Sequence, residues 1–294
     1  MPKAQGKLYL VSTPIGNLED ITLRALRILK EVDLIACEDT RHTRLLLNHF
    51  ETKTHTVSYH EHNELTRSEE LLKTLLSGKS IAIVSDAGTP LISDPGFRLV
   101  EKAIGAGVDV VPIPGVSALV TALSSSGLAT DAFYFGGFLP ARRSARRATY
   151  NGVQSIEATL IFYETPRRLS ASIADALEML GNRKAVVARE LTKLHEEIVR
   201  GTLSQIQERF SSAESIRGEI VLIIDRGQVG TSDDPALKDG ENRTNISVLV
   251  ARYIDEGSDR RAALKRAARD LNLTRSEAYR LWQLGQRWQS EKSN

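Results

Sequence analysis

The chain has 294 residues, of which 41% are hydrophobic and 26% charged, and its formal net charge is +2. This balance is typical of globular domains and excludes a collagen-like or strongly disordered chain. Cys37 is the only cysteine, which excludes an intramolecular disulfide and a multi-thiolate metal site and favours a reducing compartment. The sequence shows neither a membrane-length apolar run nor a secretory signal pattern, so we expect a cytoplasmic protein with no membrane partner.

Strand-like apolar runs alternate with helical patterns through the first half of the chain. Strands are predicted at Leu8–Val11, Val32–Ala36, Thr54–Val57, Ile81–Val84 and Val108–Val111. Helices are predicted at Thr22–Lys30, Thr40–Asn48, Glu64–Leu76, Pro95–Ala106 and Val116–Ser125. The alternation predicts an N-terminal α/β domain over residues 1–128, with a mostly parallel sheet and helices on both of its faces.

The second half has denser strands and a linker-like segment. Residues 129–227 are predicted to form a second α/β domain with a mixed sheet, from strands at Thr159–Tyr163, Ala185–Ala188 and Glu219–Asp225 and a helix at Ala171–Leu180. Residues 228–243 have the Gly, Asp and Pro content of a linker. Residues 244–294 are predicted to form a small all-helical module like a helix-turn-helix, with Thr274 as an N-cap and Glu277 at the capping-box position.

Three loops rich in Gly, Pro, Ser and Thr follow predicted strands of the first domain, at residues 12–22, 85–96 and 112–119. Open α/β sheets bind small molecules at the carboxyl ends of their strands. Gly and Pro also punctuate ordinary turns, which would explain one such loop. Three such loops in one domain favour a shared ligand site.

A cluster of ionisable side chains follows the second predicted strand: Glu38, Asp39, Arg41 and His42. Asp39 or Thr40 alone is explained as the N-cap of the next helix. The groups that this leaves unexplained are the Glu38 carboxylate, the Arg41 guanidinium and the His42 imidazole. Together they suit a site for an anionic or ribose-bearing substrate. His60 lies beyond another strand, where a substrate contact is favoured over a metal ion because no third ligand is evident. We expect no metal.

Two basic clusters stand apart from the rest of the chain. Arg142, Arg143, Arg146 and Arg147 lie in a stretch without acidic residues, between residues 132 and 156. The second cluster, in the C-terminal module, includes Arg260, Arg261, Lys265 and Arg266. Solvated helix faces are the ordinary explanation of such runs. The excess of positive charge makes phosphate binding, and hence a nucleic-acid partner, an equal expectation.

The three strand-end loops, together with Glu38–Thr43, resemble the tetrapyrrole methylase superfamily in sequence and in order along the chain. Gly88-Thr89-Pro90 corresponds to a Gly-Asp-Pro cofactor loop, with Thr89 in place of the acidic residue and Asp86 upstream. The resemblance implies two α/β domains, a homodimer, and S-adenosylmethionine bound in the cleft between the domains. The cofactor-binding residues that it implies are Pro14, Ile15, Gly16, Asp86, Gly88, Thr89, Ile92, Ser117, Ala118, Tyr163 and Leu191.

Within the superfamily, the chain is similar to the branch that methylates the 2′-hydroxyl of a cytidine in the decoding region of small-subunit ribosomal RNA. This implies ribosomal RNA or a 30S-type particle as the partner. A methylase of a small tetrapyrrole and a non-catalytic RNA-binding assembly factor are the alternatives. The basic clusters disfavour a planar macrocycle, and the intact cofactor loops disfavour a non-enzyme. A ribose hydroxyl is a weak nucleophile that needs a base, and Glu38, Asp39, His42 and His60 are the candidates.

Overall fold

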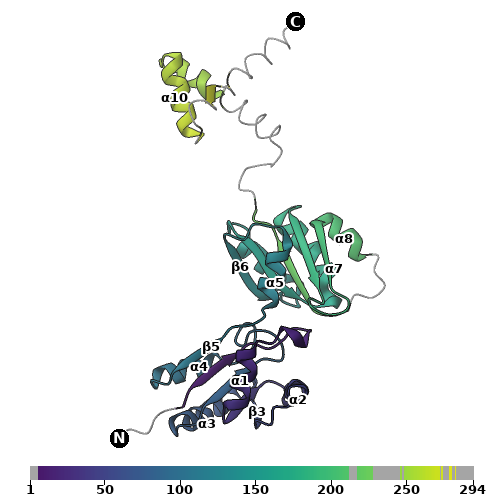
Figure 1. The fold of residues 1–294 in the computed structure, drawn as a ribbon. Helices are drawn as coiled ribbons and strands as arrows, with labels where there is room; N and C mark the ends of the chain where they lie inside the picture. Colours follow the sequence, from purple (N-terminus) through teal and green to yellow (C-terminus); the bar gives the residue numbers. More distant parts are fainter. Residues whose placement is uncertain are drawn as a thin grey trace. The chain divides into compact units, whose positions relative to one another are not determined.

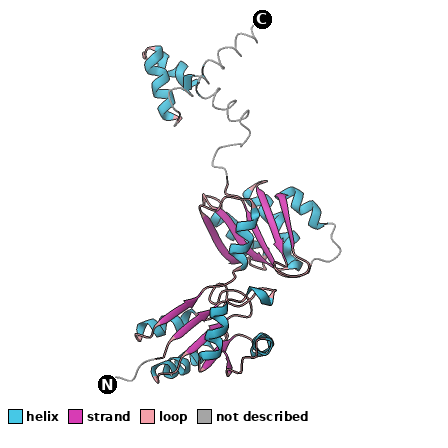
Figure 2. Cartoon of the chain, in the orientation of Figure 1, coloured by secondary structure: helices cyan, strands magenta, loops and turns pink. Residues whose placement is uncertain are grey.

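The computed structural model describes residues 6–211, 217–227, 246, 248–271, 273, 278, 279 and 282. The chain divides into two compact units, Met1–Gly227 and Gln228–Asn294. Figures 1 and 2 show two sheets in the first unit and short helices in the second. The predicted linker, residues 228–243, and the predicted cap formed by Thr274 and Glu277 lie outside the described residues.

The first sheet is parallel throughout, as the alternation of strands and helices predicts. Its strand order is β3-β2-β4-β1-β5. Because every strand runs in the same direction, all five carboxyl ends lie at one edge of the sheet. The strands are β1 (Leu8–Val11), β2 (Leu34–Cys37), β3 (Thr56–Ser58), β4 (Ile81–Val84) and β5 (Val110–Ile113).

Helices cover both faces of this sheet. One core joins Ile28, Leu29 and Leu47 to strand residues such as Ile35, and the other joins Leu71, Leu75 and Leu99 to residues such as Ala36. Successive strand side chains point to opposite faces, which is why neighbours in β2 enter different cores. The helices are α1 (Leu23–Glu31), α2 (Thr40–His49), α3 (Glu64–Leu76) and α4 (Phe97–Gly105), and a 3-10 turn spans Leu18–Asp20.

The second sheet is mixed, again as predicted. Its order is β6-β7-β10-β8-β9, with β6 and β7 parallel and the other pairs antiparallel. Its strands are β6 (Phe133–Phe138), β7 (Thr159–Glu164), β8 (Lys184–Arg189), β9 (Glu197–Thr202) and β10 (Ile220–Ile224). The sequence prediction missed β6, β9 and the helix after β9. Gly136 and Gly137 interrupt the strand pattern in β6, and the Arg and Gly residues do so in β9.

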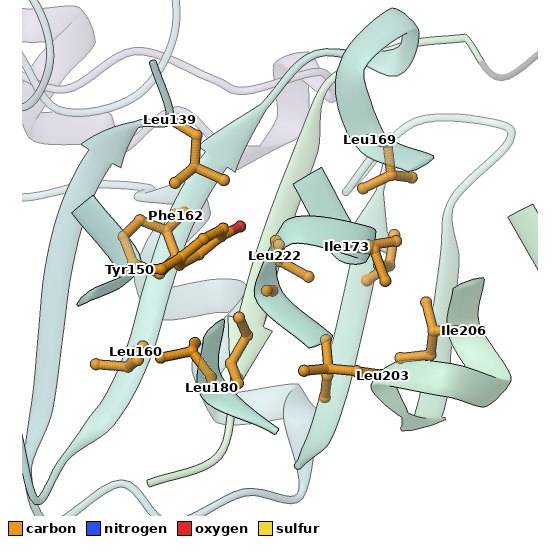
Figure 3. Close-up of a cluster of buried hydrophobic side chains, with 14 of the residues drawn as sticks. Leu139, Tyr150, Leu160, Phe162, Leu169, Ile173, Leu180, Leu203, Ile206 and Leu222 are labelled. Carbon is orange, nitrogen blue, oxygen red and sulfur yellow. The ribbon is translucent and has the colours of Figure 1, made fainter. Parts of the chain in front are cut away.

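Large apolar side chains fill one side of the second sheet, as Figure 3 shows for Tyr150, Phe162, Ile173 and Leu222. This core joins the strands to α6 (Arg143–Val153), α7 (Pro166–Leu180) and α8 (Leu203–Ser211). The opposite face packs against α5 (Ala118–Ser126).

Helix α5 follows a strand of the first sheet but packs on the second. Its Leu119 and Leu123 share a core with Val221 and Ile223 of β10, and Ile15 from the loop after β1 joins the same core. The chain therefore passes from one sheet to the other just before α5. This crossing places the loop that ends at Ser117 beside both halves of the unit.

The predicted phosphate-binding arginines of α6 are largely neutralised. The Arg146 side chain is 4% exposed, and its Nε donates to Oδ2 of the buried Asp175 at 2.8 Å. Arg143 pairs with Asp175 and Arg147 with Glu178, both on α7. The expectation of uncompensated charge is therefore wrong for these three residues, because carboxylates some thirty residues away fold against them.

The second unit is a small helical cluster, consistent with the predicted module. Residues 248–255 are helical, and α10 spans Arg260–Asp270 with Asp259 as its N-cap. Val250, Tyr253 and Ala267 belong to its core. Among the described residues, no helix is long and apolar enough to cross a membrane.

Replacing Asp175 by Ala should lower the free energy of unfolding by about 3–5 kcal/mol, because it leaves the buried Arg146 guanidinium without a counter-charge. Denaturant unfolding measures this change. Glu178→Ala is the matched control: its partner Arg147 lies nearer the surface, so the loss should stay at or below about 1 kcal/mol. Equal losses in the two variants would contradict the assignment of Arg146 and Asp175 as a buried pair.

Candidate functional site

The three strand-end loops lie against one another at the carboxyl edge of the first sheet. Thr13 and Gly88 exchange two backbone hydrogen bonds of 2.9 and 3.0 Å, and Gly88 has a φ of +80° that favours glycine. A Cβ on Gly115 would come within 2.7 Å of the Cβ of Ser12. The hydroxyl groups of Ser12 and Thr89 are 3.2 Å apart. Backbone pairing and close approach thus hold the loops together.

A first cavity of about 370 Å³ lies beside these loops. Its volume falls within the roughly 300–1,000 Å³ typical of small-molecule sites. The loops after β1, β4 and β5 form part of its wall, and the second sheet, its adjoining loops and the start of α7 supply the rest. The residues from this second part are Phe138, Tyr163, Glu164, Thr165, Pro166, Ala188, Leu191, Gly218, Glu219, Ile220 and Val221.

Most residues that the sequence resemblance assigns to the cofactor line this first cavity: Ile15, Asp86, Gly88, Thr89, Ile92, Ser117, Ala118, Tyr163 and Leu191. Pro14 and Gly16 do not. They line a second cavity, which meets the first at Ile15, Asp86, Ala87 and Glu219.

Asp94 is the residue of the first cavity whose charge is most perturbed. Burial raises the pKa of its carboxyl to about 7, and the neighbouring Glu38 and Asp86 carboxylates act in the same direction. Burial also raises the pKa of Glu38. Within the described part of the chain, the Asp94 side chain has no hydrogen-bond or ion-pair partner. A half-buried carboxylate without a partner is available to a ligand.

Glu164 lines the same cavity but is already engaged. One of its oxygens accepts from the Thr165 amide at 2.7 Å and pairs with Arg168 at 2.8 Å, and the other accepts from the buried Ser172 hydroxyl. Its role is to fix the start of α7 at the cavity wall. Asp94 and Glu164 are therefore not equivalent, although both are acidic and both line the cavity.

The sequence reasoning did not single out Asp94, although a signal for it exists. Ser85-Asp86-Ala87-Gly88 and Ser93-Asp94-Pro95-Gly96 share one pattern at a spacing of eight residues. The backbone around the second copy is unusual, because Leu91 and Ser93 have φ values of 73° and 66°, a region that residues other than glycine rarely occupy. The repeated Ser-Asp pattern could have directed attention to both aspartates.

Asp39 is the N-cap of α2, which is the structural explanation that the sequence analysis offered for this residue. Its Oδ1 accepts from the Arg41 amide at 2.8 Å, and its Oδ2 pairs with the exposed Arg41 guanidinium at 2.8 Å. These hydrogen bonds lower the pKa of Asp39 to about 2. A carboxylate with so low a pKa is a weak base.

The four bases predicted from the sequence differ in their surroundings. Glu38, Asp39 and His60 line neither cavity, whereas His42 lines the second. His60 lies in the turn before α3, where its amide donates to Oδ1 of Asn63 at 2.9 Å. Its Nδ1 is buried without a hydrogen-bond partner in the described structure. The structure therefore gives His60 a place in a local turn rather than on a cavity wall.

These features define a class: a two-sheet α/β protein with an acidic small-molecule cavity at the strand ends. The Tetrapyrrole (Corrin/Porphyrin) Methylases family matches residues 7–207. A Halalkalibacterium halodurans protein named Ribosomal RNA small subunit methyltransferase I is 46% identical over 278 residues, covering 95% of either chain. A protein of the same name from Bacillus subtilis is 41% identical over 96% of this chain and 95% of its own.

Solved structures agree on the fold. Diphthine synthase has a TM-score of 0.60 at 15% identity, over 75% of this chain and 90% of its own. Uroporphyrin-III-C-methyltransferase from Thermus thermophilus has a TM-score of 0.54 at 20% identity, over 75% and 94%. The chain belongs to the tetrapyrrole methylase family, and its cofactor is S-adenosylmethionine.

The residues of the first cavity fit this cofactor. The Asp86 carboxylate on the cavity wall matches the positive charge of its sulfonium and ammonium groups. Ile92, Leu191 and Ile220 offer apolar surface for a nucleoside. When bound, the cofactor supplies an activated methyl group, so the protein's own contribution is orientation, exclusion of water and proton transfer.

Replacing Ser117 by Trp should fill the first cavity and abolish measurable binding of S-adenosylmethionine, because Ser117 lines the wall between the two sheets. Titration calorimetry measures the affinity. Ser124→Trp, at an exposed position of the helix that follows Ser117, is the control and should bind normally. Unchanged affinity in the Ser117 variant would place the cofactor elsewhere.

Proposed function

We propose that the protein transfers a methyl group from S-adenosylmethionine to the ribose 2′-hydroxyl of a cytidine in the decoding region of small-subunit ribosomal RNA. The RNA assignment rests on the relatives named as ribosomal RNA small subunit methyltransferases, which match nearly the full chain. Acting on a 30S-type particle as a homodimer is part of the same proposal. The observation that carries the chemistry is the unpaired carboxylate of Asp94 in the cofactor cavity.

In this mechanism Asp94 accepts the proton of the 2′-hydroxyl as the hydroxyl oxygen bonds to the methyl carbon. Bound S-adenosylmethionine would supply the methyl group and keep the electron pair of its carbon–sulfur bond, leaving as a neutral thioether. A base works best when its pKa lies near the working pH, and a value of about 7 meets this condition where the value of about 2 at Asp39 does not. Asp94 thus replaces Asp39 as the proposed base.

The proposal is tested with unmethylated small ribosomal subunits, the full chain and S-adenosylmethionine, with mass spectrometry of the nucleosides as the readout. The wild type should produce 2′-O-methylcytidine, with kcat/KM rising with pH and levelling off above about 7. Asp94→Asn should lower turnover roughly 10²–10⁴-fold and remove this pH dependence. A variant with normal turnover and an unchanged pH profile would exclude Asp94 as the base.

Stability measurements on the same variant separate chemistry from folding. The folded-state pKa of Asp94 lies above the value of about 4 expected in the unfolded chain, so the folded protein binds more protons between these values. Ionisation of Asp94 therefore costs stability as the pH rises through this window. Asp94→Asn should match the wild type near pH 4 and be more stable at pH 8. An inactive variant that is also less stable at pH 8 would indicate a structural defect instead.

The second unit offers a surface for the RNA backbone. Arg261, Lys265 and Arg269 follow one another at four-residue spacing on α10, and all three are exposed. By contrast, Arg266 stacks over Tyr253 and Arg260 over Trp282. The three residues of the stripe have no ion-pair or hydrogen-bonded side-chain partner among the described residues, which leaves their charges for phosphates.

Changing Arg261, Lys265 and Arg269 together to Ala should weaken RNA binding and flatten its salt dependence, by about one unit of log–log slope for each phosphate that these side chains neutralise. Binding to small subunits at several salt concentrations measures this. Affinity for S-adenosylmethionine should not change, because the first cavity lies entirely in the other unit. An unchanged salt slope would assign this stripe to another function.

A further inference from the structure

The loop Leu91–Gly96 carries Asp94 to the wall of the first cavity, and its backbone is strained. Leu91 and Ser93 have positive φ values, which residues other than glycine rarely adopt. Such a conformation persists only where the surrounding structure holds it. The loop therefore needs a fixed point outside itself.

The loop ends at Gly96, the N-cap of α4, which cannot cap this helix with a side chain. Its φ is 138°, and a Cβ here would lie 3.1 Å from two side-chain carbons of Leu91. Glycine is therefore favoured at this position. Most helices satisfy their first amide groups with a Ser, Thr, Asp or Asn side chain at the N-cap. The first amide groups of α4 must find an acceptor on another element.

The carboxylate of Glu64, the first residue of α3, is that acceptor. Its Oε1 accepts from the Gly96 amide at 3.2 Å and from the Arg98 amide at 3.4 Å. Its Oε2 lies 3.4 Å from Nε of the Arg98 guanidinium. The negative charge also lies at the positive end of the α4 dipole, which stabilises it further. A side chain from a different helix thus takes the place of the missing N-cap.

Glu64 is itself fixed by the first sheet. The Tyr59 hydroxyl donates to Oε1 of Glu64 at 3.1 Å, and the Tyr59 ring is buried in the core under α3 and α4. Burial, together with the Glu64 carboxylate, raises the pKa of Tyr59 well above its usual range, so the hydroxyl keeps its proton and donates. The Tyr59 amide donates to the carbonyl of Cys37, at the end of β2, at 2.7 Å. Hydrogen bonds therefore link β2 through Tyr59 and Glu64 to Gly96.

Pro95 is the only residue between Gly96 and Asp94. Its ring fixes its own φ at about −65° and disfavours the helical region for the residue before it. Few backbone torsions can move Asp94 once Gly96 is held. Glu64 lines neither of the two cavities, so its effect on the site must pass through this short segment of backbone.

We propose that Glu64 is a positioning residue for methyl transfer, which caps α4 and thereby holds the Asp94 carboxylate in the first cavity. This inference rests on the proposed function, in which Asp94 is the base. The charged groups that face Asp94 are the carboxylates of Glu38 and Asp86, which repel it, and the Tyr163 hydroxyl also lies near it. Because its charged neighbours do not hold Asp94 in place, the loop backbone must do so.

Glu64→Ala tests the proposal in the methylation assay, at saturating S-adenosylmethionine. The kcat should fall about 10–10²-fold, the loss expected when a reacting group moves by about 1 Å. The KM for small subunits should stay within about twofold of the wild type. The pH at which kcat/KM levels off should move below about 7, because a relaxed loop returns water to Asp94. Hydrogen exchange should become faster in peptides that span residues 91–98.

Two control variants separate positioning from charge and from general loosening of the helices. Glu64→Gln keeps an oxygen that can accept the same three hydrogen bonds, so its kcat and pH profile should stay close to those of the wild type. A direct effect of the Glu64 charge on Asp94 would instead appear equally in Glu64→Gln and Glu64→Ala. Glu69→Ala removes an ion pair with Lys102 that joins the same two helices, α3 and α4, and should leave kcat, pH profile and exchange unchanged. A Glu64→Ala variant that behaves like Glu69→Ala would overturn the proposal.

A double variant tests whether Glu64 acts through Asp94. In the Asp94→Asn background, adding Glu64→Ala should lower turnover by less than about twofold, because the group that Glu64 positions is already gone. Losses that multiply would overturn the proposal, since Glu64 would then act through another group. Normal turnover in Asp94→Asn alone would also overturn it.

The outcomes distinguish this inference from the proposed function. If the wild type is active and Glu64→Ala keeps the wild-type kcat and pH profile, the function stands and the inference fails. If the wild type produces no 2′-O-methylcytidine, the proposed function fails, and hydrogen exchange alone decides whether Glu64 holds the loop. Faster exchange at residues 91–98 in Glu64→Ala, but not in Glu69→Ala, would support that role, and equal exchange would overturn it.

Discussion

The close approach of the strand-end loops of the first sheet is the constraint on which the site depends. Thr13 and Gly88 pair through their backbones, and Gly115 lies so near Ser12 that no side chain would fit between them. Only glycine satisfies both the positive φ at position 88 and the close approach at position 115. Because the loops are fixed in this way, the two cavities form on either side of one shared wall, at Asp86 and Ala87.

Two aspartate carboxyl groups at this edge of the first sheet have pKa values that are shifted in opposite directions. The Asp39 carboxylate accepts hydrogen bonds from the Arg41 guanidinium and from amides at the start of α2, and these lower its pKa to about 2. Asp94 is half-buried near Glu38 and Asp86, and its pKa rises to about 7. Hydrogen bonds to the charged form explain the first shift, and loss of water together with like charges explains the second. Position in the fold, not residue type, therefore decides which carboxylate can serve as a base.

The basic clusters make a similar point about charge. Arg146 and Asp175 form a buried pair, so a residue that suggests phosphate binding in the sequence belongs to the core between α6 and α7. On α10 the stripe of Arg261, Lys265 and Arg269 meets no such partner among the described residues and stays exposed. A charge run therefore indicates a nucleic-acid surface only when the fold leaves its charges unpaired.

The sequence by itself determined the fold class, the alternation of strands and helices along the first half of the chain, and the family. Hydrophobic periodicity and strand-end loops are local patterns, so Leu8–Val11, Ile81–Val84 and Glu64–Leu76 could be predicted residue for residue. Only the tertiary structure decided which polar residues share a surface. It brought Asp94 next to Glu38 and joined Arg146 to Asp175. These relations join residues far apart in the chain, and burial and pKa depend on such neighbours, which no local pattern records.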